Sequence, residues 1–350
     1  MSKSSGLGLG GFLIGIGLGW VVFSYLEVSS TMLSWLIILA GAAVIASSLI
    51  SRSGYRNKYG SLVGGLVGGL VLSLIFTSGF SFITDVFNGD SSGSYTARDT
   101  QTFNGAITVN RISLEIDNFN GPISVSTWSK NEYSVELDIR AKREEYLDDL
   151  KIEFDIKEQT MAQGISLAYD IPQTSQSRYA IGVEIFLPAD ALINLDLASS
   201  NGAISLTDIE SESIDLRTSN GAIELNNVNA EEIDGETSNG GLSGTFEAPD
   251  TSLSTSNGII DLVLPCTVSG DYMLRTSNGR IDLKVSSSTQ VGYDLELSTS
   301  NGGIDADVPN LDYSTNQNTR KVAKTENFAA KDVKISIDAD TSNSNIDVDT

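Results

Sequence analysis

The sequence contains no histidine, and Cys266 is the single cysteine among its 350 residues. Without histidine, neither a Ser-His-Asp nor a Cys-His catalytic site can form, and zinc held by histidine is excluded as well. One cysteine permits no disulfide within the chain. The folded part must therefore be held together by something other than disulfides.

Basic residues are also scarce, with 22 Lys and Arg against 45 Asp and Glu and a formal net charge of −23. Residues 1–83 carry 4 basic residues and 1 acidic residue, net +3, which leaves 18 basic and 44 acidic residues, net −26, for residues 84–350. So acidic a region is expected to stay in solution and to bind no nucleic acid.

Charge is missing altogether from three apolar stretches, residues 6–26, 32–50 and 62–82. At ~1.5 Å per residue, each is long enough to cross about 30 Å of hydrocarbon as a helix. These stretches predict three transmembrane helices within a membrane region of residues 1–83. A cleaved signal peptide is the alternative for the first stretch, although no small-residue cleavage pattern follows it before Glu27.

Basic residues near the apolar stretches predict the orientation in the membrane. The loop over residues 51–61 holds three of them, and Lys3 lies at the N-terminus, whereas the loop between the first two stretches holds only Glu27. By the positive-inside rule, the N-terminus is cytoplasmic. Three crossings then place a linker at residues 84–99 and a C-terminal domain at residues 100–350 outside the cytoplasm, in a multi-pass protein of the cell membrane.

One short phrase, "TSNGAIEL" in its copy at residues 218–225, recurs along the C-terminal domain. The intervals between its asparagines are 18 to 23 residues, and a degenerate copy follows at Asn343 in "TSNSNIDV". Weaker copies stand at Asn104 and Asn120, and a turn without the phrase is expected near "TENFAAKDVKI". Periods near 20 residues are typical of stacked-repeat folds. The predicted turn pairs are Asn201-Gly202, Asn220-Gly221, Asn239-Gly240, Asn257-Gly258, Asn278-Gly279 and Asn301-Gly302.

Alternating sequences on both sides of each phrase indicate two strands around a corner, so that Ile214, Leu216, Ile223 and Leu225 share one inner face. Asn and Gly accept positive φ angles readily, and we expect that conformation at the corner. Stacking at about 4.8 Å between strands explains the near-constant period. The prediction is an all-β domain, a parallel β-solenoid with coils of about 20 residues; stacked antiparallel hairpins are the alternative.

Residues 128–197 interrupt the repeats. "EYSVELDIRAK", "LKIEFDIKEQ", "GISLAYDIP" and "RYAIGVEIFLP" predict longer alternating strands, which we expect to form an antiparallel insertion that caps one end of the solenoid. The C-terminal repeat, "SNSNIDVDT", has no obvious cap. It is expected either to leave an open edge for another chain or to be shielded by its own charges.

These features together resemble a known family. N-terminal membrane helices, the segment "IFLPADALINLDLASSNGAISL" and the repeated "TSNGxIxL" are similar to the prokaryotic putative-adhesin family of β-solenoid domains, whose function is unknown. The resemblance covers roughly residues 100–350. It implies a surface-exposed structural or adhesive domain attached to a membrane, and it supplies no catalytic residues.

The sequence favours an adhesin or a structural scaffold at the cell envelope and not an enzyme. Its expected partners are the lipid bilayer, an envelope polymer or surface protein, and another copy of the chain. An envelope-stress sensor that signals to a cytoplasmic partner is one alternative. A polysaccharide-acting enzyme that uses carboxylates is another, although Trp128 is the only tryptophan of the C-terminal domain and few aromatic rings are available to stack on sugars.

An acidic row is the one candidate for metal binding. In several repeats, a carboxylate lies between the two inward aliphatic residues of the strand after the corner, so these carboxylates share an outer edge. No cofactor is expected apart from Ca²⁺, which prefers oxygen ligands and would bridge the row. The alternative is an ordinary solvated face, on which neighbouring charges repel by about 0.9 kcal/mol per pair. The candidate ligands are Glu224, Asp261, Asp282, Asp305 and Asp347.

Overall fold

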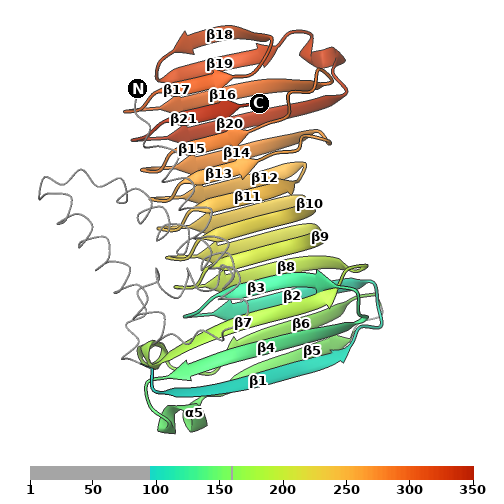
Figure 1. The fold of residues 1–350 in the computed structure, drawn as a ribbon, viewed down its shortest axis with the longest axis vertical. Helices are drawn as coiled ribbons and strands as arrows, with labels where there is room; N and C mark the ends of the chain where they lie inside the picture. Colours follow the sequence, from blue (N-terminus) through green and yellow to red (C-terminus); the bar gives the residue numbers. More distant parts are fainter. Residues whose placement is uncertain (1–94, 159–160) are drawn as a thin grey trace, which may run out of the picture. The chain divides into compact units, whose positions relative to one another are not determined.

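The computed structural model describes residues 95–158 and 161–350, and nearly all of their secondary structure is β-strand (Figure 1). The all-β prediction for the C-terminal domain is confirmed. The three predicted membrane helices and most of the predicted linker lie outside the described residues. Within those residues, no helix is long and apolar enough to cross a bilayer.

The repeats form rungs that stack on one another through parallel pairing. β9 (Ile204–Thr218) and β10 (Ile223–Thr237) pair in register from Ile204 opposite Ile223 to Thr218 opposite Thr237. Branched and aliphatic side chains alternate along both strands with polar ones, and this alternation puts one set inside. Ile214, Leu216, Ile223 and Leu225 are all buried, as the alternation predicts.

Each rung has two limbs, one before and one after its corner. The limbs before the corner form a column in which neighbours in space are hydrogen-bonded. In spatial order this first column contains β2 (Arg111–Asn118), β8 (Leu192–Ser199), the second halves of β9 and β10, β12 (Asp250–Thr255), β14 (Gly270–Thr276), β20 (Val333–Thr341) and β16 (Val291–Thr299).

The limbs after the corner form a second column that runs alongside the first. Aliphatic side chains from both columns, such as Ile233 and Ile260, fill the space between them with a continuous core. In spatial order the second column contains β3 (Ile123–Trp128), the first halves of β9 and β10, β11 (Leu242–Glu247), β13 (Ile260–Val263), β15 (Ile281–Lys284), β21 (Ile346–Asp349) and β17 (Ile304–Asp307).

A cap of longer strands closes the end of the stack next to β2 and β3. β7 pairs in parallel with β3 and is followed by antiparallel β4 and β1, while β6 pairs in parallel with β2 and is followed by antiparallel β5. Phe103 of β1 stacks on Phe154 of β5 with 4.3 Å between ring centroids, which joins the two outermost strands. The cap comprises β1 (Ala97–Ala106), β4 (Glu132–Ala141), α5 (Glu145–Asp149), β5 (Ile152–Glu158), β6 (Gln163–Tyr169), η1 (Gln173–Arg178) and β7 (Tyr179–Pro188).

Two details of the cap differ from the sequence-based expectation. β1 begins at Ala97, within the stretch predicted as a linker, and it contains Asn104 in the middle of a strand paired with β4. The weak repeat at Asn104 is therefore not a corner, because its neighbours continue in extended conformation. Asn120 does lie at a corner, between β2 and β3.

The opposite end shows a larger difference. β18 (Leu311–Gln317) and β19 (Arg320–Thr325) form an antiparallel hairpin beside β16, so no solenoid turn forms near "TENFAAKDVKI", where η2 (Phe328–Ala330) lies instead. β20 and β21 then return between strands that precede them in sequence (Figure 1). The expectation of an open or charge-shielded edge at the C-terminal repeat is wrong, since both sides of that repeat are paired.

Candidate binding edge at the stacked corners

A buried threonine closes most corners two residues before the corner asparagine, and Ser199 takes its place before Asn201. The Thr237 hydroxyl donates to the Gly221 carbonyl of the neighbouring rung at 2.9 Å and accepts the Gly240 N–H of its own corner at 3.1 Å. Two buried backbone groups that the strands leave unpaired are thereby satisfied. The same donation to a neighbouring glycine carbonyl is made by Thr218, Thr255, Thr276 and Thr341.

Glycine follows the corner asparagine because two rungs approach closely there. A Cβ atom on Gly221 would overlap the carbonyl oxygen of Gly202, and the same overlap recurs at each of the other predicted corner glycines. Within the described residues, positive φ angles at glycine occur only at Gly121 and Gly244, and the corner asparagines have none. The expected positive φ is therefore wrong for the six predicted turn pairs, where steric access, not backbone handedness, requires glycine; the corner after Asn120 differs, since Gly121 has φ of 128°.

The corner asparagines form an exposed ladder along the stack. The Asn239 Nδ2 donates to Asn220 Oδ1 at 2.8 Å, and Asn257 Nδ2 donates in turn to Asn239 Oδ1 at 2.8 Å. Because every amide points the same way, successive hydrogen bonds polarise one another. Six such bonds, each 2.8 Å long, join Asn201, Asn220, Asn239, Asn257, Asn278, Asn343 and Asn301 in spatial order.

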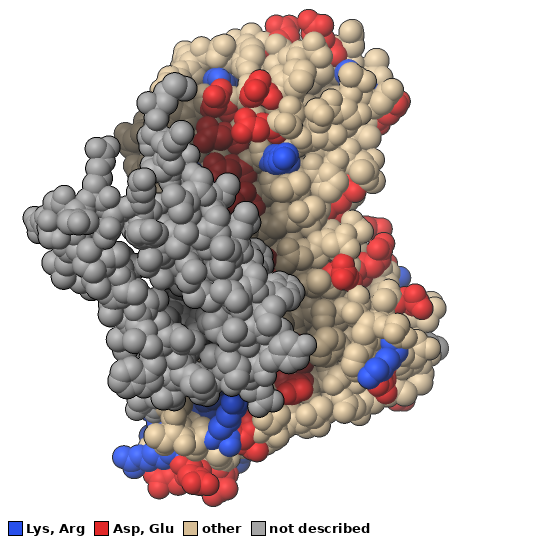
Figure 2. All heavy atoms as spheres, in the orientation of Figure 1, with Lys and Arg blue, Asp and Glu red and all other residues tan. Residues whose placement is uncertain are grey.

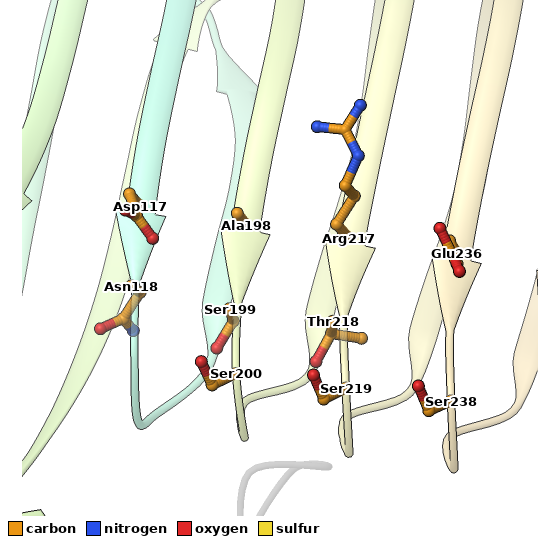
Figure 3. A pocket seen from close by; sticks show the side chains of 10 residues that line it. All are labelled: Asp117, Asn118, Ala198, Ser199, Ser200, Arg217, Thr218, Ser219, Glu236 and Ser238. Carbon is orange, nitrogen blue, oxygen red and sulfur yellow. The ribbon is translucent and has the colours of Figure 1, made fainter. Parts of the chain in front are cut away.

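Beside this ladder runs a shallow polar groove of about 290 Å³ (Figure 3). Its rim at the corner is a row of exposed serines, Ser200, Ser219 and Ser238, whose hydroxyls lie at the ends of adjacent strands. The opposite rim is formed by the outward residues one position before the buried polar residues Asn118, Ser199, Thr218 and Thr237. In spatial order these are Asp117, Ala198, Arg217 and Glu236.

Ala198 gives the groove its depth, because its methyl group stands between the longer side chains of Asp117 and Arg217. Arg217 forms an ion pair with Asp215 on its own strand and lies 3.7 Å from Asp196 on the neighbouring one. Burial raises the pKa of Asp215, while Arg217 acts to lower it. The groove therefore offers a carboxylate at each end and hydroxyls along one side, while Figure 3 shows the Arg217 guanidinium turned away from the serine row.

The structure brings most of the predicted calcium ligands together. Asp261, Asp282, Asp347 and Asp305 are successive register partners in the second column, in that spatial order. Glu224 is separated from them by the rung that carries Ser243. Acidic side chains also predominate over basic ones on the face shown in Figure 2.

Like charges repel one another within the carboxylate column, which consists of Asp261, Asp282, Asp347 and Asp305. Burial raises the pKa of Asp282 and of Asp347, and neighbouring carboxylates raise both further, while Arg280, 2.5 Å from Asp282, opposes the shift. In the part of the chain that the structure describes, no group of three or more His, Cys, Asp or Glu side chains is arranged to hold a metal ion. Calcium binding stays a prediction.

Two features of this edge were not predicted from the sequence. The threonine column carries the corner hydrogen bonds, and its signal was available, since threonine stands two residues before the asparagine in most copies of the phrase. The groove is harder to find. Its residues Asp117, Ala198, Arg217 and Glu236 share only their distance from the corner and no common chemistry.

Several solved structures are similar to this chain. A putative cell adhesion protein from Clostridium sporogenes is 9% identical and covers 72% of this chain and 99% of its own, with a TM-score of 0.33. A putative adhesin from Bacteroides fragilis is 12% identical, with 71% and 97% covered and a TM-score of 0.33. Another from Parabacteroides distasonis is 10% identical, with 73% and 98% covered and a TM-score of 0.29.

No curated protein matches the sequence significantly. The sequence of residues 84–348, in contrast, matches a protein family described as Toastrack DUF4097. This match extends from just before the first cap strand to the last rung and includes the whole groove. The chain belongs to the Toastrack DUF4097 family.

Proposed function

We propose that this protein is a membrane-anchored adhesin or scaffold that binds an extended polymer outside the cytoplasm, along the groove beside its corners. The observation that carries the proposal is the row of Ser200, Ser219 and Ser238 that borders a groove of about 290 Å³ with Asp117 and Glu236 at its two ends. These groups supply hydroxyl and carboxylate partners to a ligand rich in hydroxyls, such as a polysaccharide.

The direction of the groove favours an elongated ligand. Its lining comes from β2, β8, β9 and β10, four neighbours in the first column, so the groove crosses rungs spaced by about 4.8 Å. A chain lying along the stack meets a serine at each of the three rungs that follow β2. Enclosed pockets suit compact ligands, whereas a shallow open groove suits part of a longer molecule.

Rigidity supports binding as well. The serines are held next to the asparagine ladder and the buried threonine column, which leave little freedom at the corner. A preorganised surface loses less conformational entropy when it binds, so more of the interaction free energy appears as affinity.

The spacing of the groove carboxylates favours binding over hydrolysis. Asp117 and Glu236 are three rungs apart, which at ~4.8 Å per rung places their backbones about 14 Å from each other. Paired carboxylates that cleave glycosides are separated by roughly 5 to 9.5 Å. The two ends of the groove are thus too far apart to act on one glycosidic bond.

The membrane anchor rests on the amino-acid sequence. Three uncharged stretches precede the described domain, and the basic loop between the second and third supports, by the positive-inside rule, a domain outside the cytoplasm. Such an anchor would hold the groove at the cell surface, where an envelope polymer or matrix is available.

The proposal is tested by binding of the full-length protein, in detergent, to a panel of insoluble envelope polysaccharides. Arg217→Ala is expected to reduce the bound fraction at least severalfold, because it removes the one basic side chain among the lining residues and frees the charges of Asp196 and Asp215 beside the groove. Arg320→Ala is the matched control, since its side chain is equally exposed, at 55%, and also pairs with a carboxylate. Equal binding by both variants, or no binding by the wild type, would contradict the proposal.

A further inference from the structure

The last rung in sequence is not the last rung in space. β20 lies between β14 and β16, and β21 lies between β15 and β17, although both strands follow all four of those partners along the chain (Figure 1). The slot that receives them is therefore made by residues that are synthesised earlier.

The inserted pair, β20 and β21, is paired with neighbouring strands on both sides. β20 has seven register partners in β14 and nine in β16, and Asn343 occupies its place in the asparagine ladder by donating to Asn278 and accepting from Asn301. Aliphatic side chains from the pair complete the core. Those fully buried are Ile335, Ile337, Ala339, Ile346 and Val348.

The order of synthesis leaves this slot open for a time. β16, β17 and the β18–β19 hairpin emerge from the ribosome before β20 and β21, so they cannot join the stack until the missing rung arrives. During that interval, the edges of β14 and β15 present unpaired backbone groups, which are a template for a further strand.

The slot accepts a pair of strands that carries the repeat pattern. It requires alternating aliphatic residues that enter the core, a threonine whose hydroxyl reaches the Gly279 carbonyl at 2.9 Å, and an asparagine in register with Asn278. Val333–Asp349 satisfies all three requirements, and every copy of the chain carries it.

The connection to the inserted pair can serve as a hinge. Residues 326–332 join β19 to β20 through η2, and Asn327 adopts a left-handed conformation with φ of 57°. If this connection opens, the strand pair can reach the slot of another copy while every contact inside the slot stays the same. Exchange of an identical element in this way generates closed two-fold dimers.

We infer that β20 and β21 are exchanged between two copies of this chain during synthesis, which gives a dimer in which each copy completes the other's stack. The exchange is fixed once folding ends, because the inserted pair is then hydrogen-bonded on both sides. This inference does not depend on the ligand proposed for the groove. It adds a second copy of the chain as a partner.

Disulfide trapping tests the exchange in the full-length protein. Asp271 of β14 and Ser336 of β20 are outward-facing register partners, and adjacent strands at about 4.8 Å allow a disulfide. Two differently tagged copies, both with Cys266→Ser, are co-expressed in one cell. One carries Asp271→Cys and the other Ser336→Cys, and an oxidant is added after isolation of the membranes.

A covalent dimer carrying both tags is expected. The matched control co-expresses Asp271→Cys with Asp250→Cys, whose strands β12 and β14 pair within one chain and are not exchanged, so it should give at least tenfold less dimer. A second exchanged pair, Met273→Cys with Asp338→Cys, repeats the test at another register position. Mixed dimer no more abundant than in the control, with both pairs, overturns the inference.

Discussion

Asn343 donates a hydrogen bond of 2.8 Å to the side chain of Asn278, which lies 65 residues earlier, and Asn301 in turn donates to Asn343. Sequence order and spatial order therefore differ at this end of the stack. The ladder nevertheless continues without a break, because each rung offers the same amide at the same place.

Close approach of the corner backbones predicts a large effect for Gly221→Ala. The added methyl group would overlap the Gly202 carbonyl, so two rungs must separate along their whole corner. We expect the free energy of unfolding to fall by about 3 kcal/mol or more, or folding to fail. Thermal unfolding followed by circular dichroism measures the change.

Gly164→Ala is the matched control for that substitution. A methyl group there would lie 3.5 Å from the Lys157 Cβ, an ordinary contact in a strand of the cap. Its effect should stay within about 1 kcal/mol. Similar losses in the two variants would show that steric contact between corners is not what requires glycine.

The buried threonine column predicts opposite outcomes for two substitutions of similar size. Thr237→Val preserves shape but leaves the Gly221 carbonyl and the Gly240 N–H without their partner, at a cost of about 2 to 4 kcal/mol. Thr237→Ser retains the hydroxyl and loses only a methyl group, so about 1 kcal/mol is expected. Denaturant unfolding distinguishes them, and a valine variant as stable as the serine variant would refute this role of the hydroxyl.

The carboxylate column predicts a particular pH dependence. Burial, Asp305 and Asp349 raise the pKa of Asp347 above its unfolded value of 3.8, so the folded state binds the proton more tightly. The resulting stability is fully present below pH 3.8 and is lost as the pH rises through the folded pKa. Asp347→Asn should therefore stabilise the protein at pH 7, by up to about 1 kcal/mol, and flatten the profile above pH 4.

Glu224→Gln is the control for charge removal in the same column, since the register partners of Glu224 are Ser205 and Ser243. Because this variant keeps Asp347 and Asp282, its unfolding free energy should follow the wild-type pH profile between pH 4 and 7. If Asp347→Asn proves less stable than the wild type at pH 7, attraction to Arg280 outweighs burial and repulsion, and the assigned direction is wrong.

Calcium gives a further test of the predicted ligands. If Asp261, Asp282, Asp347 and Asp305 share bound cations, millimolar Ca²⁺ should raise the melting temperature more than NaCl of equal ionic strength. Asp347→Asn should remove this difference, and Glu224→Gln should retain it. Identical melting temperatures in the two salts would leave the column as an ordinary solvated face.

Much of the rung could be predicted from the sequence, because burial imposes a period of two on its strands. Ile214, Leu216, Ile223 and Leu225 lie inside as expected. The strands over residues 128–197 were also found, since long alternating runs carry a strong signal. The positive φ predicted for the corners was wrong. Asn-Gly commonly marks positive φ, but here glycine is required by the close contact between stacked rungs, such as that of Gly202 with Gly221.

The spatial order of the rungs could not be predicted. The corners at Asn301 and Asn343 present nearly the same face to a neighbour, so local pattern does not decide which of them lies beside Asn278. The groove was missed for a related reason. Its depth depends on Ala198 lying between Asp117 and Arg217, two residues brought together only by pairing across rungs.

The central claim, that the groove beside the corners binds a polysaccharide, is tested most directly by filling it. Ala198→Leu adds bulk between Asp117 and Arg217 and removes no charge or hydroxyl. We predict that the full-length variant keeps the wild-type melting temperature within a few degrees. Its affinity for the panel polysaccharide that binds the wild-type protein should be at least tenfold lower. Unchanged binding by a folded Ala198→Leu variant would contradict the claim.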